Sequence, residues 1–397
     1  MDNFNFIKKE PITKGWSGDK KYCVATTDGS KYLLRISPIE QNKRKKAEFE
    51  MMQRVASLGV PMCQPIEFGI CDEGVYSLQS WIDGDDAESK IPTMSDTEQY
   101  FYGLEAGRIL KKIHSIPAPE TQEDWETRFN RKIDRKIKMY NDCPIKYENG
   151  QAFIDYINAN RHLLKDRPQV YQHGDYHIGN MMIDKDAKLQ IIDFDRDDFG
   201  DPWEEFNRIV WCSEKSPLFA SGMVNGYFEG NVPMDFWKLL ALYISSNTLS
   251  SVPWAIPFGQ DEIDTMLNQA KEILHWYDNM KNFVPSWYSD FRPGKCFCGH
   301  DCSRCITYLA TVRNDENLRI QSQRFYKDAF NLDIPLNEMH CFGGRSNNIF
   351  KLCCDCPWMK CCRERKIDAC SECAEYPCKP LAEYQAKYVN KCNQLGD

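Results

Sequence analysis

The strongest constraint on the fold comes from residues 171–195, whose sequence is YQHGDYHIGNMMIDKDAKLQIIDFD. Two apolar stretches, residues 181–183 and 189–192, flank the turn residues 185–188, and this pattern predicts a β-hairpin with a four-residue turn. The hairpin brings together, at its open end, the polar residues just outside the two apolar stretches. The segment therefore predicts a site in which acidic and amide side chains act together.

The register of the predicted hairpin determines which polar side chains meet. If Ile183 lies opposite Gln190, then Asn180 lies opposite Asp193, and cross-strand Cβ atoms are about 4.5–5.5 Å apart. An amide oxygen and a carboxylate at that separation are hard ligands that suit magnesium bridging nucleotide phosphates. An acidic turn in an ordinary hairpin accounts for one or two of these residues, but not for all of them in this order along the chain.

Asp175 adds a catalytic role to this metal site. It lies five residues before Asn180, the interval of the kinase catalytic loop, where the Asp meets the substrate hydroxyl and the Asn holds a metal. We expect Asp175 to accept the hydroxyl proton, while magnesium held by Asn180 and Asp193 neutralises charge on the transferred phosphoryl group. We expect Asp195 to assist a second metal or its waters, and His173 to brace the loop.

The flanking sequence predicts two lobes, the first rich in strands and the second mostly helical. A helix between them begins with a capping box at Ser95 and Glu98, and two amphipathic helices follow the acidic segment. The predicted elements, in chain order, are the strands 21–27 and 31–37 around the turn 28–29, the helix 43–59, the strand 75–81, and the helices 235–245 and 261–280.

Length, composition and charge limit the possible functions. The chain has 397 residues, of which 42% are hydrophobic, enough for two or three hydrophobic cores. The formal net charge of −8 argues against a general nucleic-acid-binding protein, which needs clustered Lys and Arg for phosphate contacts. The N-terminal sequence lacks a signal-peptide pattern, and no apolar stretch approaches the roughly 20 residues that span a bilayer, so we expect a cytoplasmic protein without membrane contact.

The motifs HGDYHIGN and IIDFDRDDFGDPWEEF resemble the catalytic and metal-binding segments of the aminoglycoside phosphotransferase and choline kinase superfamily, and the resemblance extends over about residues 12–290. It implies an α+β, bilobal, protein-kinase-like fold that binds its nucleotide between the lobes. We accordingly expect a small, β-rich N-lobe at residues 1–85 and a mostly helical C-lobe at residues 86–292. The resemblance also implies ATP or GTP as co-substrate and Mg2+ as cofactor.

The resemblance further suggests which residues contact the nucleotide. Arg35 occupies the strand position where many relatives have a phosphate-binding lysine, and Glu48 is its expected helix partner, with Glu50 as the competing candidate. Strand alternation places Arg35 on the face opposite Leu34 and Ile36, and a guanidinium fork grips phosphate oxygens. The glycines that precede the first of the predicted strands fit an ordinary turn almost as well as they fit a phosphate-binding loop. The expected phosphate-covering loop and adenine-binding hinge are formed by Gly15, Ser17 and Gly18, and by the backbone from Gln79 to Trp81.

An acidic stretch follows the hairpin and bears on the substrate. Residues 193–205 contain seven carboxylates and one arginine. The carboxylates that no metal needs favour a cationic acceptor through electrostatic focusing, such as an aminoglycoside or another polyamine-like hydroxyl compound. Solvated loop acids and acids at a helix N-terminus explain them equally well. The candidate substrate-binding residues are Asp197, Asp198, Asp201, Glu204 and Glu205.

The sequence up to residue 292 thus predicts a small-molecule kinase that transfers the γ-phosphoryl group of ATP or GTP to a hydroxyl group. The expected acceptor is an aminoglycoside-like or other cationic compound, which implies a role in antibiotic resistance. A choline, ethanolamine or amino-sugar kinase is the nearest alternative. A nucleotide-binding regulatory scaffold, whose C-terminal domain docks a protein partner, is an alternative of another class, and the intact set of Asp175, Asn180 and Asp193 argues against it.

Cysteine is distributed very unevenly and marks a separate domain at residues 296–397. Five of the 19 cysteines lie in residues 1–295 and fourteen in residues 296–397. Because the preceding region resembles an intracellular enzyme, in which thiols stay reduced, metal ligation is favoured over disulfides. We expect structural Zn2+, with an iron–sulfur cluster as the chemical alternative. The candidate ligands are Cys298, Cys302, Cys305, Cys341, Cys353, Cys356, Cys361, Cys370, Cys373 and Cys378.

The C-terminal region resembles a cysteine-rich bacterial domain of unknown function over about residues 296–385, through the opening CGHDCSRC and the ending CSECAEYPC. The resemblance names no activity and no protein partner. The segment CFGGRS has one cysteine, Cys341, where the resemblance suggests two, and Cys354 or Cys362 can take the missing place. His300 and His340 are candidates for a catalytic zinc site, but structural zinc is the preferred interpretation.

Overall fold

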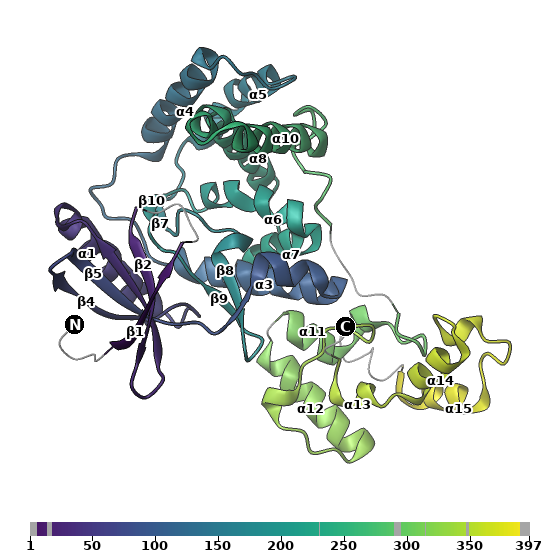
Figure 1. Cartoon of the computed structure of the whole chain (residues 1–397). Coiled ribbons are helices and arrows are strands. Elements are labelled where there is room, and N and C mark those ends of the chain that lie inside the picture. Colours follow the sequence, from purple (N-terminus) through teal and green to yellow (C-terminus); the bar gives the residue numbers. More distant parts are fainter. Residues whose placement is uncertain are drawn as a thin grey trace. The chain divides into compact units, whose positions relative to one another are not determined.

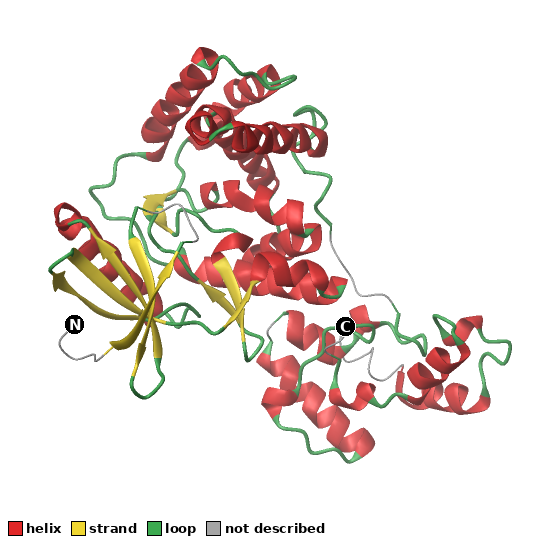
Figure 2. Cartoon of the chain, in the orientation of Figure 1, coloured by secondary structure: helices red, strands yellow, loops and turns green. Residues whose placement is uncertain are grey.

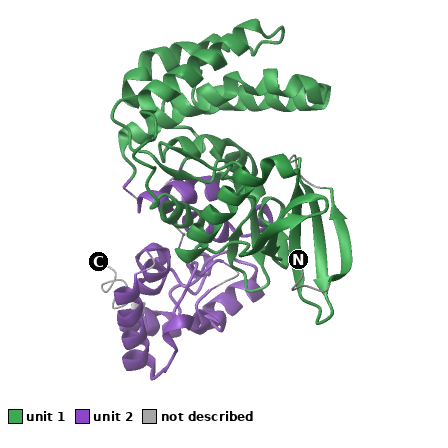
Figure 3. Cartoon of the chain, turned by 90° about the vertical axis from the view of Figure 1, so that its left-hand side faces the viewer, with its two compact units in different colours: residues 1–90, 106–217, 232–288 green, residues 91–105, 218–231, 289–397 purple. Residues whose placement is uncertain are grey.

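The structure is a computed structural model that describes residues 6–13, 18–229, 231–289, 295–313, 315–346 and 349–389. Contacts between residues group the chain into two compact units, which Figure 3 shows in different colours. The first unit comprises residues 1–90, 106–217 and 232–288, and the second comprises residues 91–105, 218–231 and 289–397. The domain boundaries near residues 85 and 292 stay predictions, because the second unit also takes in parts of two helices from the expected C-lobe.

The first unit begins with a five-stranded antiparallel sheet in the order β1-β2-β3-β5-β4 (Figure 1). Its buried core includes Leu34, Ile36 and Leu78, so Arg35 lies on the opposite face of β3, as the sequence predicts. The predicted hairpin at residues 21–37 is confirmed. The strands are β1 (Phe6–Ile12), β2 (Lys20–Thr26), β3 (Lys31–Ser37), β4 (Pro65–Cys71) and β5 (Gly74–Ser80).

One helix, α1 (Asn42–Ser57), packs against β4 and β5 of this sheet and confirms the helix predicted there. Its buried residues Phe49, Met52 and Val55 recur every three positions, which places them on one face of the helix. The helix ends before Gly59, whose φ of 71° is in the left-handed region that favours glycine.

The residues after the sheet are mostly helical (Figure 2), and α8 is buried along most of its length. The predicted helices are confirmed as α8 and α10, and the backbone N–H of Ser95 donates to the Glu98 carboxylate at 3.1 Å just before α3. The α-helices are α2 (Ala87–Lys90), α3 (Asp96–Ile113), α4 (Trp125–Asp142), α5 (Gln151–Asn160), α6 (Ile209–Lys215), α7 (Pro217–Phe228), α8 (Met234–Leu249), α9 (Ser251–Ala255) and α10 (Gln260–Trp276).

Short elements connect these helices and carry the site. The 3-10 helices are η1 (Ile39–Gln41), η2 (Ile91–Thr93), η3 (Arg161–Leu164), η4 (Ile178–Asn180), η5 (Glu204–Arg208) and η6 (Ile256–Phe258). One small sheet has the strand order β6-β8-β9, and a second pairs β7 with β10. Their strands are β6 (Gly84–Asp86), β7 (Val170–Gln172), β8 (Met181–Asp184), β9 (Leu189–Ile191) and β10 (Asp198–Gly200).

The hairpin formed by β8 and β9 is confirmed, but its predicted register is wrong by one residue. Ile183 pairs with Leu189 rather than with Gln190, and the register places Asn180 opposite Ile192 rather than opposite the predicted Asp193. The loop holds three residues instead of four, because the backbone N–H of Asp184 already pairs with the Lys188 carbonyl at 3.0 Å. The last loop residue, at position 187, has a left-handed φ of 58°, as three-residue hairpin loops require.

The second unit contains most of the cysteines. Within it, the first part of α3 crosses α7 closely, since a Cβ on Gly103 would lie 2.2 Å from the carbonyl oxygen of Phe219. The elements of its C-terminal part are η7 (Cys302–Arg304), α11 (Ile306–Val312), α12 (Glu316–Phe330), η8 (Leu336–Glu338), α13 (Lys351–Cys354), α14 (Pro357–Arg365), η9 (Cys370–Glu372), α15 (Lys379–Tyr384) and the π-helical turn η10 (Gln385–Val389). None of the helices in the described ranges is long and apolar enough to cross a membrane.

Candidate active site

Asp175 lies in the loop between β7 and η4, surrounded by basic side chains. Its carboxylate oxygens lie 3.3 Å from Nε of Arg208, 3.6 Å from Nε2 of His177 and 3.8 Å from Nε of Arg196. The loop turns at Gly174, where φ is 83° and where a Cβ would lie 1.8 Å from the backbone oxygen of Arg196. Only glycine fits this close approach, which brings residue 196 beside the catalytic candidate.

Buried polar side chains hold this loop in shape. Glu205, only 2% exposed, accepts hydrogen bonds from the backbone N–H groups of Gly174 at 3.0 Å and Tyr176 at 3.4 Å. His173 is fully buried, and its Nε2 lies 3.0 Å from the carbonyl oxygen of Ile192 on the neighbouring segment. The expected bracing role of His173 is confirmed. Glu205 was expected to bind substrate, and this expectation is corrected, because the carboxylate is buried against the loop backbone.

Asn180 is positioned by the same loop. Its Nδ2 donates to the backbone oxygen of Asp175 at 2.9 Å, so the amide is oriented by the chain on which the catalytic candidate lies. Because Nδ2 faces the backbone oxygen of Asp175, the other atom of the amide, Oδ1, points away from that oxygen. The backbone oxygen of Asn180 accepts from Ile192 N at 3.0 Å, which ties the end of η4 to the segment leading to Asp193.

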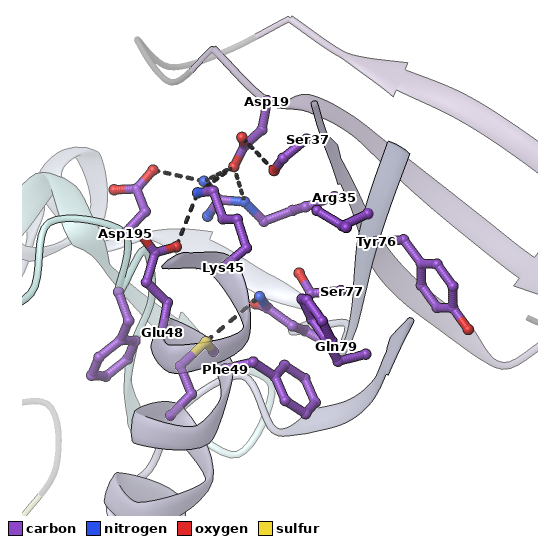
Figure 4. Close-up of a pocket in the computed structure, with 14 residues that line it drawn as sticks. Asp19, Arg35, Ser37, Lys45, Glu48, Phe49, Tyr76, Ser77, Gln79 and Asp195 are labelled. Carbon is purple, nitrogen blue, oxygen red and sulfur yellow. Dashed lines mark hydrogen bonds and ion pairs between the residues drawn. The ribbon is translucent and has the colours of Figure 1, made fainter. Parts of the chain in front are cut away.

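Asp193 and Asp195 meet Arg35 of β3. The guanidinium donates through Nη1 to Asp193 and through Nη2 to Asp195, each at 2.7 Å. It also donates to Asp19, through Nη2 at 3.0 Å and Nε at 3.2 Å. Figure 4 shows Arg35 pointing toward Asp19 and Asp195 in the pocket. The backbone at Asp193 has a left-handed φ of 68°, a strained conformation of the kind that concentrates at functional sites.

These contacts shift the titration of the carboxylates. Burial is the largest single effect on Asp193 and favours its neutral form, but the charges of Arg35 and Lys21 and the hydrogen bond from Arg35 together outweigh it and hold the pKa of Asp193 below its usual value. The pKa of Asp19 is lowered in the same way, against burial, by the Ser37 hydroxyl and by Arg35. Both acids are therefore ionised at neutral pH.

The donor set fits a divalent cation. Asp19 has a second cationic partner, Lys45 at 3.1 Å, whereas Asp193 and Asp195 share the single charge of Arg35. An excess of negative charge therefore remains on oxygen atoms of the kind that magnesium prefers, and the amide oxygen of Asn180 belongs to the same chemical class. The residues present thus have the ligand chemistry of a magnesium site, and magnesium binding by Asn180, Asp193 and Asp195 stays a prediction.

Glu48 does not take the partner that the sequence predicts. Its carboxylate pairs with Lys45 at 3.0 Å and Arg44 at 2.6 Å, both on its own helix, and the described partners of Arg35 are the three aspartates. Lys45 lies one turn before Glu48 on the same helix and also reaches Asp19. The ion pair between Lys45 and Glu48 within the helix therefore forms in place of the predicted pair between Glu48 and Arg35. Lys45 and Asp19 were not among the predicted residues, and the spacing of Lys45 from Glu48 is the only sequence signal for them. Figure 4 shows Lys45 lying between Asp19 and Glu48.

The expected nucleotide-binding loop and hinge stay predictions. Gly15 and Ser17 lie outside the described residues, and Gly18 has open space where a Cβ would extend. Gln79 is buried and lines the pocket beside Arg35, and the indole N–H of Trp81 donates to Asp83 at 3.1 Å. The structure thus places Gln79 near Arg35.

The acids after the hairpin do not form one surface. Asp198 pairs with Arg128 at 3.2 Å, and Glu204 pairs with Lys132 at 3.0 Å. Asp201 is fully buried and pairs with Arg167 at 2.6 Å. Burial and the nearby charge of Glu48 raise the pKa of Asp197 to about 6. Of the acids proposed for a cationic substrate, most therefore already have basic partners within the chain.

The candidate zinc ligands are divided among several buried clusters. Cys298, Cys362 and Cys370 share one cluster with Cys296 and Cys378 at its edge, whereas Cys341 and Cys305 belong to two others. All 18 cysteines in the described residues are free thiols. Within those residues no group of three or more Cys, His, Asp or Glu side chains has the arrangement of a metal site. Zinc binding in this domain stays a prediction.

A site built from an Asp loop, an Asn five residues later and an Asp after a hairpin, under a sheet that supplies an arginine, defines a kinase-like phosphotransferase. The family described as "Phosphotransferase enzyme family" matches residues 9–237, which is more than half of the chain, so this protein belongs to that family. Residues 295–383 match a family described as a protein of unknown function. A comparison with curated protein sequences finds no match.

Solved structures with the same kinase-like fold agree with this assignment. The GDP complex of an aminoglycoside 2'-phosphotransferase mutant shares 14% identity with a TM-score of 0.52, over 71% of this chain and 96% of the other. A choline/ethanolamine kinase family protein from Mesorhizobium loti shares 14% identity with a TM-score of 0.51, over 70% and 91%. Amicoumacin kinase hAmiN, with AMP-PNP, Ca2+ and Ami, shares 12% identity with a TM-score of 0.52, over 72% and 92%. The fold of the phosphotransferase part is therefore α+β and kinase-like.

Proposed function

We propose that this phosphotransferase transfers the γ-phosphoryl group of ATP or GTP to a hydroxyl group of a small molecule. The observation that carries the proposal is that the loop bearing Asp175 and Asn180 is hydrogen-bonded, through the backbone of Ile192, to the segment whose Asp193 and Asp195 meet Arg35. Solved structures of the same fold are complexes with GDP or with AMP-PNP, which supports a nucleotide co-substrate.

Each residue has a defined task in this reaction. The acceptor oxygen forms a bond to the γ-phosphorus, the bond from that phosphorus to the nucleotide diphosphate breaks, and the hydroxyl proton passes to Asp175. Arg35, exchanging a carboxylate for phosphate oxygens, holds the nucleotide through its guanidinium fork. Asn180, Asp193 and Asp195 would hold magnesium, which neutralises charge on the phosphates when it is bound.

The basic residues around Asp175 orient the carboxylate. Arg208 contacts Oδ1 and Arg196 approaches Oδ2, so the acid is held from two sides. His177 contributes in a different way, because its Nδ1 accepts from the backbone N–H of Gly179 at 3.1 Å and fixes the ring beside the loop. A carboxylate held in one orientation is prepared to receive a proton from a hydroxyl group brought to it.

Release of ADP or GDP in the presence of candidate acceptors tests the proposal. The panel includes aminoglycosides, choline, ethanolamine and amino sugars, together with neutral and acidic hydroxyl compounds. We expect Asp175→Asn to lower kcat by about 10²–10⁴ while nucleotide binding is retained. Turnover that is unchanged in Asp175→Asn, with the fold verified by circular dichroism, contradicts the catalytic assignment.

We further propose structural zinc in the C-terminal domain and a cytoplasmic location for the protein. The contacts between Cys362 and Cys370, with their sulfurs 3.6 Å apart, and between Cys296 and Cys298, at 3.2 Å, support clustered thiols. Metal analysis of the purified chain tests the zinc proposal, since colourless protein with bound zinc agrees with it and visible absorbance indicates iron–sulfur instead. A metal-free, stably folded chain contradicts it.

A further inference from the structure

A stripe of basic residues on α4 faces the acidic stretch. Arg128, Lys132 and Lys136 are spaced four residues apart, so they lie on one face of the helix. The first two are paired with acids of the stretch, Arg128 with Asp198 at 3.2 Å and Lys132 with Glu204 at 3.0 Å. The third continues the stripe toward η5.

Lys136 lacks the acidic partner that the other two have. Its Nζ donates to the neutral amide oxygen of Asn247 at 3.4 Å, and among the described residues no carboxylate lies within ion-pair distance. Burial, together with the positive charges of Lys132 and Arg208, lowers the pKa of Lys136 to about 7 despite the opposing effect of Glu204. A partly buried ammonium group is costly without an anion, so the position favours one.

Arg208 links this lysine to the reaction centre. Its Nε lies 3.3 Å from Oδ1 of Asp175, yet this buried nitrogen has no hydrogen-bond partner of suitable geometry among the residues that the structure describes. It is also close enough to Lys136 to lower the pKa of that amine. Lys136 and Arg208 therefore act on each other electrostatically, and the carboxylate of Glu204, which pairs with Lys132, offsets part of their charge.

We propose that the acceptor carries an anionic group, a carboxylate or a phosphate, which Lys136 and Arg208 bind while its hydroxyl group meets Asp175. The inference rests on the proposed phosphotransferase function and specifies the acceptor class for it. It also reverses the expectation of a cationic acceptor, because the acids that suggested one are bound to Arg128, Lys132 and the loop backbone. An anion at Lys136 restores the charge balance that the stripe has at its other two positions.

Sulfate binding to the full chain tests the site directly. The titration is carried out at pH 6.5 with saturating magnesium and AMP-PNP, so that the nucleotide phosphates already occupy the Arg35 region. We expect sulfate to bind the native chain, to bind Lys136→Gln at least tenfold more weakly, and to bind Lys136→Arg with nearly native affinity. Gln keeps a donor for Asn247 and removes only the charge, so a folding defect is not expected.

Lys138→Gln is the matched control, since Lys138 lies on the same helix, is 76% exposed and pairs with Asp142 at 2.8 Å. Its sulfate affinity is expected to equal that of the native chain. Absence of sulfate binding, or equal affinity in Lys136→Gln and Lys138→Gln, overturns the inference. In either case, magnesium-dependent AMP-PNP binding in the same samples shows whether the proposed function itself still stands.

The acceptor class is tested with one sugar scaffold in four charge forms: glucose, glucosamine, glucuronate and glucose 6-phosphate. Inhibition by each compound of sulfate binding to the native chain is measured, so that turnover is not required. We expect the two anionic forms to compete at least tenfold better than glucose, and the difference between them identifies carboxylate or phosphate as the preferred group. Equal or better competition by glucosamine overturns the proposal.

Discussion

Arg35 is expected to stabilise the metal-free protein because its guanidinium forms ion pairs with carboxylates that otherwise repel each other. Its side chain is 8% exposed, and the side chains of Asp19, Asp193 and Asp195 are 5%, 29% and 15% exposed. Removing one partner of a fully buried ion pair costs about 3–5 kcal/mol. Because two of these aspartates retain some contact with water, we expect Arg35→Met to lower the free energy of unfolding by about 2–3 kcal/mol in EDTA.

Magnesium should reverse part of that loss. In the native chain a metal must displace Arg35 from Asp193 and Asp195, whereas in Arg35→Met both carboxylates are free to bind it. Magnesium should therefore raise the free energy of unfolding more in the variant than in the native chain, in proportion to the logarithm of its concentration above Kd. Phosphoryl transfer should still be lost, because the guanidinium that grips the phosphates is absent.

Urea unfolding at pH 7, in EDTA and in 10 mM magnesium, measures both effects. The control is Arg131→Met, which removes an exposed pair with Glu123 whose side chains are 65% and 42% exposed, and which should cost less than about 0.5 kcal/mol. A loss in Arg35→Met no larger than that of the control in EDTA, or equal stabilisation of the native chain and the variant by magnesium, contradicts this role of Arg35.

Other substitutions test the loop and the basic stripe. Gly174→Ala forces a left-handed conformation and a Cβ 1.8 Å from a backbone oxygen, so urea unfolding should show a loss of about 2 kcal/mol or more and kcat should fall about 10²-fold. Glu205→Gln removes the charge from buried hydrogen bonds to the loop and should lower stability by about 1–2 kcal/mol, and an unchanged midpoint contradicts the bracing role. The lowered pKa of Lys136 means that, between about pH 7 and 10, the unfolded chain binds a proton that the folded chain has released. Stability of the native chain relative to Lys136→Gln should therefore rise with pH in that window, and parallel pH profiles of the two proteins contradict the shift.

The local parts of the site follow from the sequence. The interval between Asp175 and Asn180 and the apolar stretches of the hairpin depend on neighbours along the chain, and the structure confirms the elements that they predict. The hairpin register does not follow, because it depends on whether the loop closes with three or four residues. That choice is made by the left-handed conformation at Ala187, for which alanine gives no signal.

Contacts between distant segments were the least predictable. Arg35 meets Asp193 across 158 positions of the chain, and a strand pattern shows its face but not which acids lie there. Glu48 has several basic neighbours within one helical turn, and only the packed structure shows that Lys45 is among its partners. Lys136 looks like any surface lysine until its neighbours on η5 are in place.

We expect Asn180, Asp193 and Arg35 together to bind a nucleotide with a divalent cation beside Asp175. Isothermal titration of AMP-PNP into the full chain, with magnesium and with EDTA, measures this binding. We predict binding that is at least tenfold tighter with magnesium, and loss of this difference in Asp193→Asn. AMP-PNP affinity that is the same in EDTA, or a magnesium effect that persists in Asp193→Asn, would contradict this expectation.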